Sequence, residues 1–220
     1  MRRWALGAAL LAAAGVLAAD VAMDAAVGSP TPAEPNYYDA PTELKWDSGV
    51  ASYSHCWYTG AGSWVGVDFS IATLTDYRLI TQMRLYCRYG WPNSAWEGGR
   101  MGVYAYGTVP GSMLWGPTWF KPTLTSSGFQ DFGIGWVLPA GSTSFIIAWE
   151  QYYGYPNADS YTVDNSTVTT GHSWDYYGGS WSRLSNTTGY NNLMLRAVVD
   201  DVNNVGIAPT SLGRVKAVYY

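Results

Sequence analysis

Apolar and polar residues alternate in several short stretches between Trp64 and Asp200. An apolar residue at every second position is typical of a strand that buries one face, so each stretch predicts a β-strand. The core-facing positions are Val65, Val67, Phe69 and Ile71 in the first stretch, Met83, Leu85 and Cys87 in the second, Met101, Val103 and Ala105 in the third, Phe132, Ile134, Trp136 and Leu138 in the fourth, and Leu193, Leu195, Ala197 and Val199 in the last. The run SFIIAWEQYY, residues 144–153, is a further strand candidate.

Turn-forming residues separate these stretches. The clearest pairs are Pro92-Asn93, Gly98-Gly99, Pro110-Gly111, Pro156-Asn157 and Gly178-Gly179. Pairs of this kind mark turns and loops between strands. The body of the chain shows neither an internal repeat of 20–50 residues nor an amphipathic helix. The pattern therefore predicts an all-β fold over residues 43–203, an antiparallel β-sandwich or jelly roll.

The two ends of the chain differ from this body. Residues 1–19 place two arginines before an apolar run that is too short to cross a bilayer, which predicts a signal peptide. Residues 20–42 contain four prolines and no periodicity, as in an extended leader. Residues 204–220 predict a short helix that begins at Thr210 or Ser211. We therefore expect a secreted protein, extracellular or at the cell surface.

Composition narrows the classes of partner. Charged residues make up only 13% of the chain, and the 12 basic residues do not cluster, so a surface for the phosphates of nucleic acid is not expected. No segment reaches the ~18 apolar residues of a spanning helix. The chain is instead rich in rings and glycine, with 12 tryptophans, 18 tyrosines and 25 glycines. This composition suits an all-β extracellular domain.

The chain has two cysteines, Cys56 and Cys87. In an exported protein such a pair predicts a disulfide bond. A metal site is the alternative interpretation, but His55 is the only ligand type beside either cysteine.

The order of these segments resembles a galactose-binding-like or jelly-roll accessory domain of secreted bacterial multidomain proteins. The resemblance covers the chain from Trp46 to Val199. It is carried by KWDSGVA, WVGVDFSIATLTDYRLITQMRLYCR, the Pro-Gly hairpin in TVPGSMLWGP, FGIGWVLPAGSTSFIIAWEQ and GYNNLMLRAVVDD. It implies a β-sandwich that accompanies catalytic or adhesive modules, and it offers no catalytic residue to carry over.

The sequence contains no motif of an established catalytic or cofactor-binding site, so we expect neither an enzyme nor a cofactor. The alternative is a small glycoside hydrolase, which needs two carboxylates across a cleft. Glu97 and Glu150 are the two glutamates of the body after Leu44. Glu150 shares a strand face with apolar residues, and its burial would suit a general acid. Glu97 lies in a glycine-rich turn, which is typical of a solvated side chain.

Four acidic residues near predicted turns could hold a structural calcium ion, because calcium accepts carboxylate and carbonyl oxygens from loops. They are Asp159, Asp164, Asp200 and Asp201. Solvated turn residues are the preferred interpretation, so we expect no metal site.

Many rings fall in segments that read as loops, most densely in GHSWDYYGGSWSRL, residues 171–184. Successive strand residues point to opposite faces, so Trp174, Tyr176 and Tyr177 cannot all point inward. A ring covers the apolar face of a sugar, and exposed rings mark binding surfaces. The predicted ligand-binding rings are Trp91, Trp96, Tyr153, Tyr155, Trp174, Tyr176, Tyr177 and Trp181. Trp115, Trp119 and Tyr152 occur in similar loops, and core packing is the alternative for every ring.

The sequence thus predicts a secreted, non-catalytic module that recognises carbohydrate or another extracellular partner through exposed rings. The first alternative is a self-associating subunit of an envelope, matrix or filament, which would dock through its leader or C-terminal tail. The second alternative is the glycoside hydrolase that would use Glu97 and Glu150.

Overall fold

The computed structural model describes residues 41–74, 78–93, 96–165, 171–184 and 192–201. They all belong to one compact unit, Tyr37–Tyr220. The predicted signal peptide, the leader up to residue 40 and the predicted C-terminal helix lie outside the described residues.

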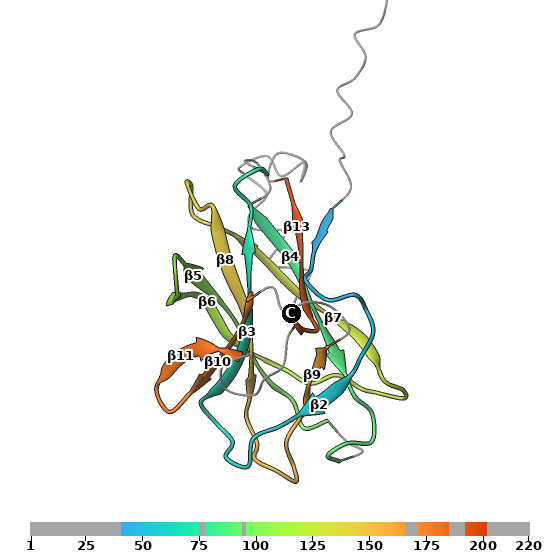
Figure 1. The fold of residues 1–220 in the computed structure, drawn as a ribbon. Helices are drawn as coiled ribbons and strands as arrows, with labels where there is room; N and C mark the ends of the chain where they lie inside the picture. Colours follow the sequence, from blue (N-terminus) through green and yellow to red (C-terminus); the bar gives the residue numbers. More distant parts are fainter. Residues whose placement is uncertain (1–40, 75–77, 94–95, 166–170, 185–191, 202–220) are drawn as a thin grey trace, which may run out of the picture. The chain divides into compact units, whose positions relative to one another are not determined.

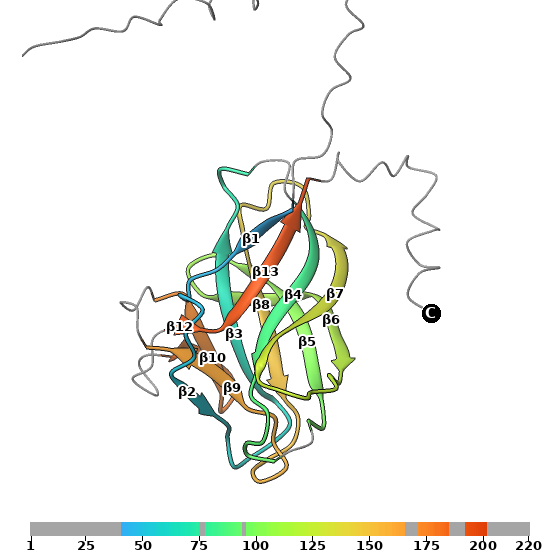
Figure 2. The same cartoon turned by 90° about the vertical axis from the view of Figure 1, so that its right-hand side faces the viewer.

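The described strands form three sheets, and each of their pairings is antiparallel (Figures 1 and 2). The four-stranded sheet has the order β1 (Thr42–Leu44), β13 (Leu195–Asp200), β4 (Leu79–Cys87) and β7 (Gly128–Val137). The six-stranded sheet has the order β11 (Ser180–Arg183), β10 (Ser173–Tyr177), β3 (Ser63–Ser70), β8 (Ser144–Gln151), β5 (Gly99–Tyr106) and β6 (Pro110–Phe120). The third sheet has the order β12 (Asn192–Leu193), β9 (Tyr161–Asp164) and β2 (Tyr53–His55).

The main core lies between the two larger sheets. The six-stranded sheet contributes alternate residues of β3, β5 and β8, and the four-stranded sheet contributes alternate residues of β4 and β13 together with Phe132 of β7. The small sheet adds Tyr161, Val163 and Leu193. The predicted inward positions therefore pack against one another across two layers, and the expectation of an all-β antiparallel sandwich is confirmed.

Residues 171–184, which read as loop in the sequence, contain a β-hairpin. Strands β10 and β11 pair directly, and Gly178 and Gly179 join them with φ angles of 67° and 93°. Only glycine adopts such angles readily, so this pair makes the tight turn possible. The strand was hidden in the sequence because rings and polar residues, rather than aliphatic residues, occupy its alternating positions.

The hairpin covers a second, smaller cluster on the outer face of the six-stranded sheet. Its buried members are Trp64, Tyr104, Ile146, Ala148 and Trp174, and its partly buried members are Tyr106, Met113, Tyr176 and Trp181. The Trp181 ring lies 5.4 Å from the Tyr104 ring, although three strands separate β11 from β5. The hairpin therefore folds toward β5. This cluster gives many of the surplus rings a buried position outside the main core.

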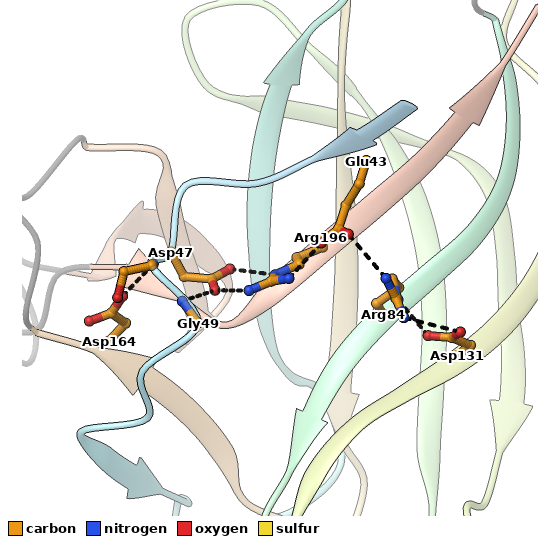
Figure 3. A network of polar contacts seen from close by, with 8 residues as sticks. Glu43, Asp47, Gly49, Arg84, Asp131, Asp164 and Arg196 are labelled. Carbon is orange, nitrogen blue, oxygen red and sulfur yellow. Dashed lines mark hydrogen bonds and ion pairs between the residues drawn. The ribbon is translucent and has the colours of Figure 1, made fainter. Parts of the chain in front are cut away.

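A chain of ion pairs fastens β1 and the following residues to the four-stranded sheet (Figure 3). The Arg196 guanidinium donates to both carboxylate oxygens of Asp47 and to Glu43 at 2.6 Å. Arg84 then joins Glu43, at 3.0 Å, to Asp131, at 2.6 Å. Figure 3 shows the whole row crossing β1, β13, β4 and β7. It ties residues that are more than 140 positions apart in the sequence.

Both cysteines are free thiols, so the predicted disulfide is wrong. Cys87 ends β4 and is buried in the main core, whereas Cys56 follows β2 of the small sheet and is partly exposed. The two cysteines thus belong to different layers, and the count of cysteines in a sequence does not contain this information. Burial raises the pKa of both thiols.

Candidate functional site

Exposed rings gather at one end of the sandwich. The loops β2–β3, β4–β5 and β8–β9 and the turn β10–β11 lie at this end, toward the bottom of Figures 1 and 2. β6 also ends here, because Phe120 pairs with Gly99 at the start of β5. Among the described residues, these segments carry seven large rings that are 37–83% exposed: Tyr58, Tyr89, Trp91, Trp119, Tyr153, Tyr155 and Tyr177. We call these seven residues the aromatic end.

The opposite end differs in chemistry. In the described part of the chain, its exposed large apolar side chains are Val109, beside the β5–β6 turn, and Val137, at the end of β7. Isolated exposed aliphatic residues are ordinary on a protein surface, whereas grouped exposed rings mark a binding surface. The aromatic end is therefore the candidate functional site.

Two glycines allow the loops of the aromatic end to touch. A Cβ atom on Gly154 would lie 2.2 Å from the backbone oxygen of Tyr58, and one on Gly60 would lie 2.5 Å from that of Tyr152. The buried Gln151 side chain links the same loops, because its oxygen accepts from Trp57 N at 2.8 Å and its nitrogen donates to the oxygens of Trp57 and Tyr153 at 2.9 Å. The loops after β2 and β8 are thus held together at backbone level.

This close approach brings rings of the two loops together. Tyr58 and Tyr155 meet edge to face, with ring centroids 5.3 Å apart. Trp57 stacks nearly parallel to Tyr177, at 6.3 Å and 10°, which links the β10–β11 turn to the same loop. Such contacts restrict the orientations of the rings, and restricted side chains lose less entropy when a surface binds.

A second group of rings lies where β6 and β8 end. The Trp119 ring is 5.1 Å from Tyr152 and 6.3 Å from Tyr153, and the two tyrosine rings are 5.1 Å apart. The three interplanar angles are 86°, 88° and 80°. We call Trp119, Tyr152 and Tyr153 the ring corner.

Charged side chains beside the ring corner are paired. Arg100 lies opposite both Trp119 and Glu150 in the strand register, and its guanidinium is 5.2 Å from the centre of the Tyr152 ring. It donates from Nε and Nη2 to Glu150, and this hydrogen bond raises the pKa of Arg100. Lys121, which follows β6, pairs with Glu97 at 3.2 Å.

A buried carboxylate supports the β4–β5 loop from below. Asp159 accepts from the backbone nitrogens of Glu97, at 2.9 Å, and Gly98, at 2.5 Å. Burial raises its pKa to about 6, although these two hydrogen bonds act in the opposite direction. The position of the loop thus depends on an acid with an unusually high pKa.

The predicted ring residues fall into three groups. Trp91, Tyr153, Tyr155 and Tyr177 belong to the aromatic end, and Tyr176 and Trp181 are partly buried in the second cluster. Trp96 and Trp174 are only 4% and 3% exposed, so the expectation that their faces meet a ligand is wrong. Trp96 packs in the main core, and the Trp174 indole is covered by Arg183 and bonded to Asp68.

Tyr58 and Tyr89 of the aromatic end were not among the rings that the sequence analysis considered, and Trp119 and Tyr152 were named there only as further loop rings. Trp119 and Tyr152 lie near turn-forming residues in the sequence. Their contact with each other, however, depends on the pairing of β5 with both β6 and β8. Tyr58 follows a strand of only three residues, which is too short for a periodic signal.

The environment of Glu150 argues against the alternative of a glycoside hydrolase. Its side chain is fully buried, and its carboxylate accepts from Arg100 and from Gly62 N at 2.7 Å. Glu97 is exposed and pairs with Lys121. Glu150 therefore cannot reach a substrate in this structure.

The four calcium candidates do not form a site. Within the described ranges, no three histidine, cysteine, aspartate or glutamate side chains gather as metal ligands. Asp159 and Asp164 are buried rather than solvated, and they accept from backbone nitrogens, as does Asp200. These residues cap turns and loops.

Comparison with known proteins gave no match to a protein-family model, to a curated protein or to a solved structure. The resemblance to galactose-binding-like accessory domains therefore stays a prediction. Helices long and apolar enough for a membrane span are absent from the part of the chain that the structure describes.

Proposed function

We propose that this protein is an extracellular, non-catalytic module that binds carbohydrate through its aromatic end. The observation that carries the proposal is the concentration of seven exposed rings at one end of a sandwich whose other end, over the described residues, has only Val109 and Val137 as exposed large apolar side chains. Their neighbouring loops are braced by Gln151, Gly60 and Gly154.

Sugars suit such a surface for two physical reasons. The C–H groups of a sugar ring make an apolar face that packs against an aromatic ring, while its hydroxyls need directed polar partners. Tyrosine and tryptophan supply large contact areas with few rotatable bonds, so little entropy is lost on binding. Arg100, Lys121, Glu97 and the tyrosine hydroxyls lie among the rings as polar partners.

The test is retention of the purified protein on a panel of insoluble and soluble polysaccharides, by pull-down and affinity electrophoresis. We expect at least one polysaccharide to retain the protein. The double variant Trp119→Ala/Tyr155→Ala is expected to lose retention, because it removes one ring from each of the two groups of rings described above.

The matched control is Tyr53→Ala/Val137→Ala, which removes two exposed apolar side chains outside the aromatic end. It should be retained like the unmodified protein. A protein that no polysaccharide retains would exclude the proposed function. A self-associating subunit would instead change its sedimentation with protein concentration.

A further inference from the structure

The geometry of the ring corner limits the shape of its ligand. Every pair among Trp119, Tyr152 and Tyr153 is close to perpendicular, with angles between 80° and 88°. Rings that bind the flat face of a crystalline polysaccharide must share a plane, so that several sugars stack at once. Here only one ring can stack on a given sugar while its neighbours contact the edge of that sugar.

The ring corner is also held rigidly by the sheet. Trp119 of β6, Arg100 of β5 and Glu150 of β8 stand opposite one another on three adjacent strands, and Tyr152 and Tyr153 follow directly after β8. Glu150 anchors the Arg100 guanidinium above Tyr152. Trp119 and Tyr153 are the more exposed members, at 44% and 40%.

The charges around the ring corner favour a neutral ligand. Arg100 and Lys121 are each paired with a glutamate, so these four side chains carry no net charge. A uronic acid or an amino sugar would have to compete with one of these ion pairs for its counter-charge. Within the described ranges, Nη1 of Arg100 has no hydrogen-bond acceptor, so it can donate to a neutral hydroxyl without breaking its pair with Glu150.

We infer that the ring corner binds a single sugar of an uncharged, soluble glycan chain, in preference to the surface of a crystalline polysaccharide. This inference rests on the proposed function and specifies its ligand class. Trp119 or Tyr153 stacks on the apolar face of the sugar, and Arg100 donates to a hydroxyl.

Calorimetric titration tests this inference with four neutral probes: cellohexaose, xylohexaose, mannohexaose and N-acetylchitohexaose. The charged probes are tetragalacturonate and chitosan hexaose, and the crystalline probes are microcrystalline cellulose and α-chitin, used in pull-downs. We expect at least one neutral soluble probe to bind at least tenfold more tightly than either charged probe. Each crystalline probe should bind the protein less tightly than that soluble probe does. An excess of the soluble probe should therefore release any protein that a crystalline probe retains.

Variants then locate the binding. Trp119→Ala and Tyr153→Ala should each weaken the association constant for the neutral probe at least tenfold, and Trp119→Phe should lose less. Tyr53→Ala is the matched control, because Tyr53 is a similarly exposed tyrosine outside the aromatic end; it should change the constant less than threefold. Unchanged thermal unfolding verifies that each variant folds.

The outcomes separate the two proposals. Binding to charged or crystalline probes alone would overturn this inference and leave the proposed function standing, as would neutral binding that neither Trp119→Ala nor Tyr153→Ala weakens. Absence of binding to all eight probes and to the polysaccharide panel would overturn the proposed function and this inference together.

Discussion

Asp159 illustrates how one buried side chain controls a surface loop. The carboxylate is almost inaccessible, yet it accepts from two consecutive backbone nitrogens at Glu97 and Gly98. Burial disfavours the charged form, which raises the pKa from 3.8 to about 6. The folded protein therefore holds this proton more tightly than the unfolded chain does between these two pH values.

This difference has a definite sign for stability. A raised pKa in the folded state stabilises the protein fully below the unfolded pKa and loses that contribution as pH rises through about 6. We expect the unfolding free energy of the protein, minus that of Asp159→Asn, to fall by about 2 kcal/mol between pH 4 and pH 7. Urea unfolding across this range measures the difference. An NMR titration of the Asp159 carboxyl with a midpoint near 4 would contradict the expectation.

Gly154 tests the backbone contact that builds the aromatic end. A Cβ atom there would meet the Tyr58 oxygen at 2.2 Å, and neither backbone can move aside cheaply. We expect Gly154→Ala to lower the unfolding free energy by about 1–3 kcal/mol, as overpacking does, and to weaken the proposed glycan binding. Thermal unfolding and pull-downs measure both effects.

Gly128 provides the control for that substitution. Its added Cβ atom would have no neighbour within 4 Å, so Gly128→Ala should shift stability by no more than about 0.5 kcal/mol. Equal melting temperatures for the two variants would show that the loops after β2 and β8 do not depend on this close contact.

At the level of strands, the ion pairs across the four-stranded sheet become more exposed from one end of the row to the other. Arg196 and the Asp47 side chain are buried at one end, whereas Asp131 at the other end is 46% exposed. Exposed ion pairs contribute about 0–1 kcal/mol, but breaking a buried pair leaves an uncompensated charge. The attachment of β1 thus depends chiefly on the buried end.

Two substitutions separate the ends of this row. We expect Arg196→Met to lower the unfolding free energy by about 3–5 kcal/mol, because it leaves the Asp47 carboxylate buried without its partner. Asp131→Asn should cost less than about 1 kcal/mol. Urea denaturation monitored by fluorescence compares them, and similar losses for both would refute a gradient of burial.

The β10–β11 hairpin shows why ring-rich strands escape a periodicity analysis. Trp174 and Tyr176 point to the outer face of the six-stranded sheet, where they join the second cluster. Tyr177 ends the strand and is half exposed. The three rings do not share one side, and the outer face of the sheet buries Trp174 and partly buries Tyr176.

Considered as a whole, the protein uses its rings in three ways. Some, such as Trp149 and Phe132, fill the space between the large sheets, and others, such as Trp64 and Trp174, form the second cluster. Seven exposed rings gather at one end of the sandwich. An all-β domain with few charged residues can thus be stable and still present apolar surface to a partner.

The strands of the main core were predictable because strand periodicity is a local property. Val65, Val67 and Phe69 alternate with residues of the outer face in the sequence, and they do so in the structure for the same steric reason. Strands such as β9 and β11 were not predicted, because four residues without aliphatic alternation carry too little signal.

The order of strands in the sheets decides which distant residues contact one another. No single segment of the sequence encodes that order. The fold class and the surplus of rings can be derived from residue types and their spacing alone. The burial of Trp96 and Trp174, the separation of Cys56 from Cys87 and the meeting of Trp119 with Tyr152 depend on which strands pair. Exposure is a property of the assembled layers, because a side chain is covered by neighbours that lie far away in the sequence.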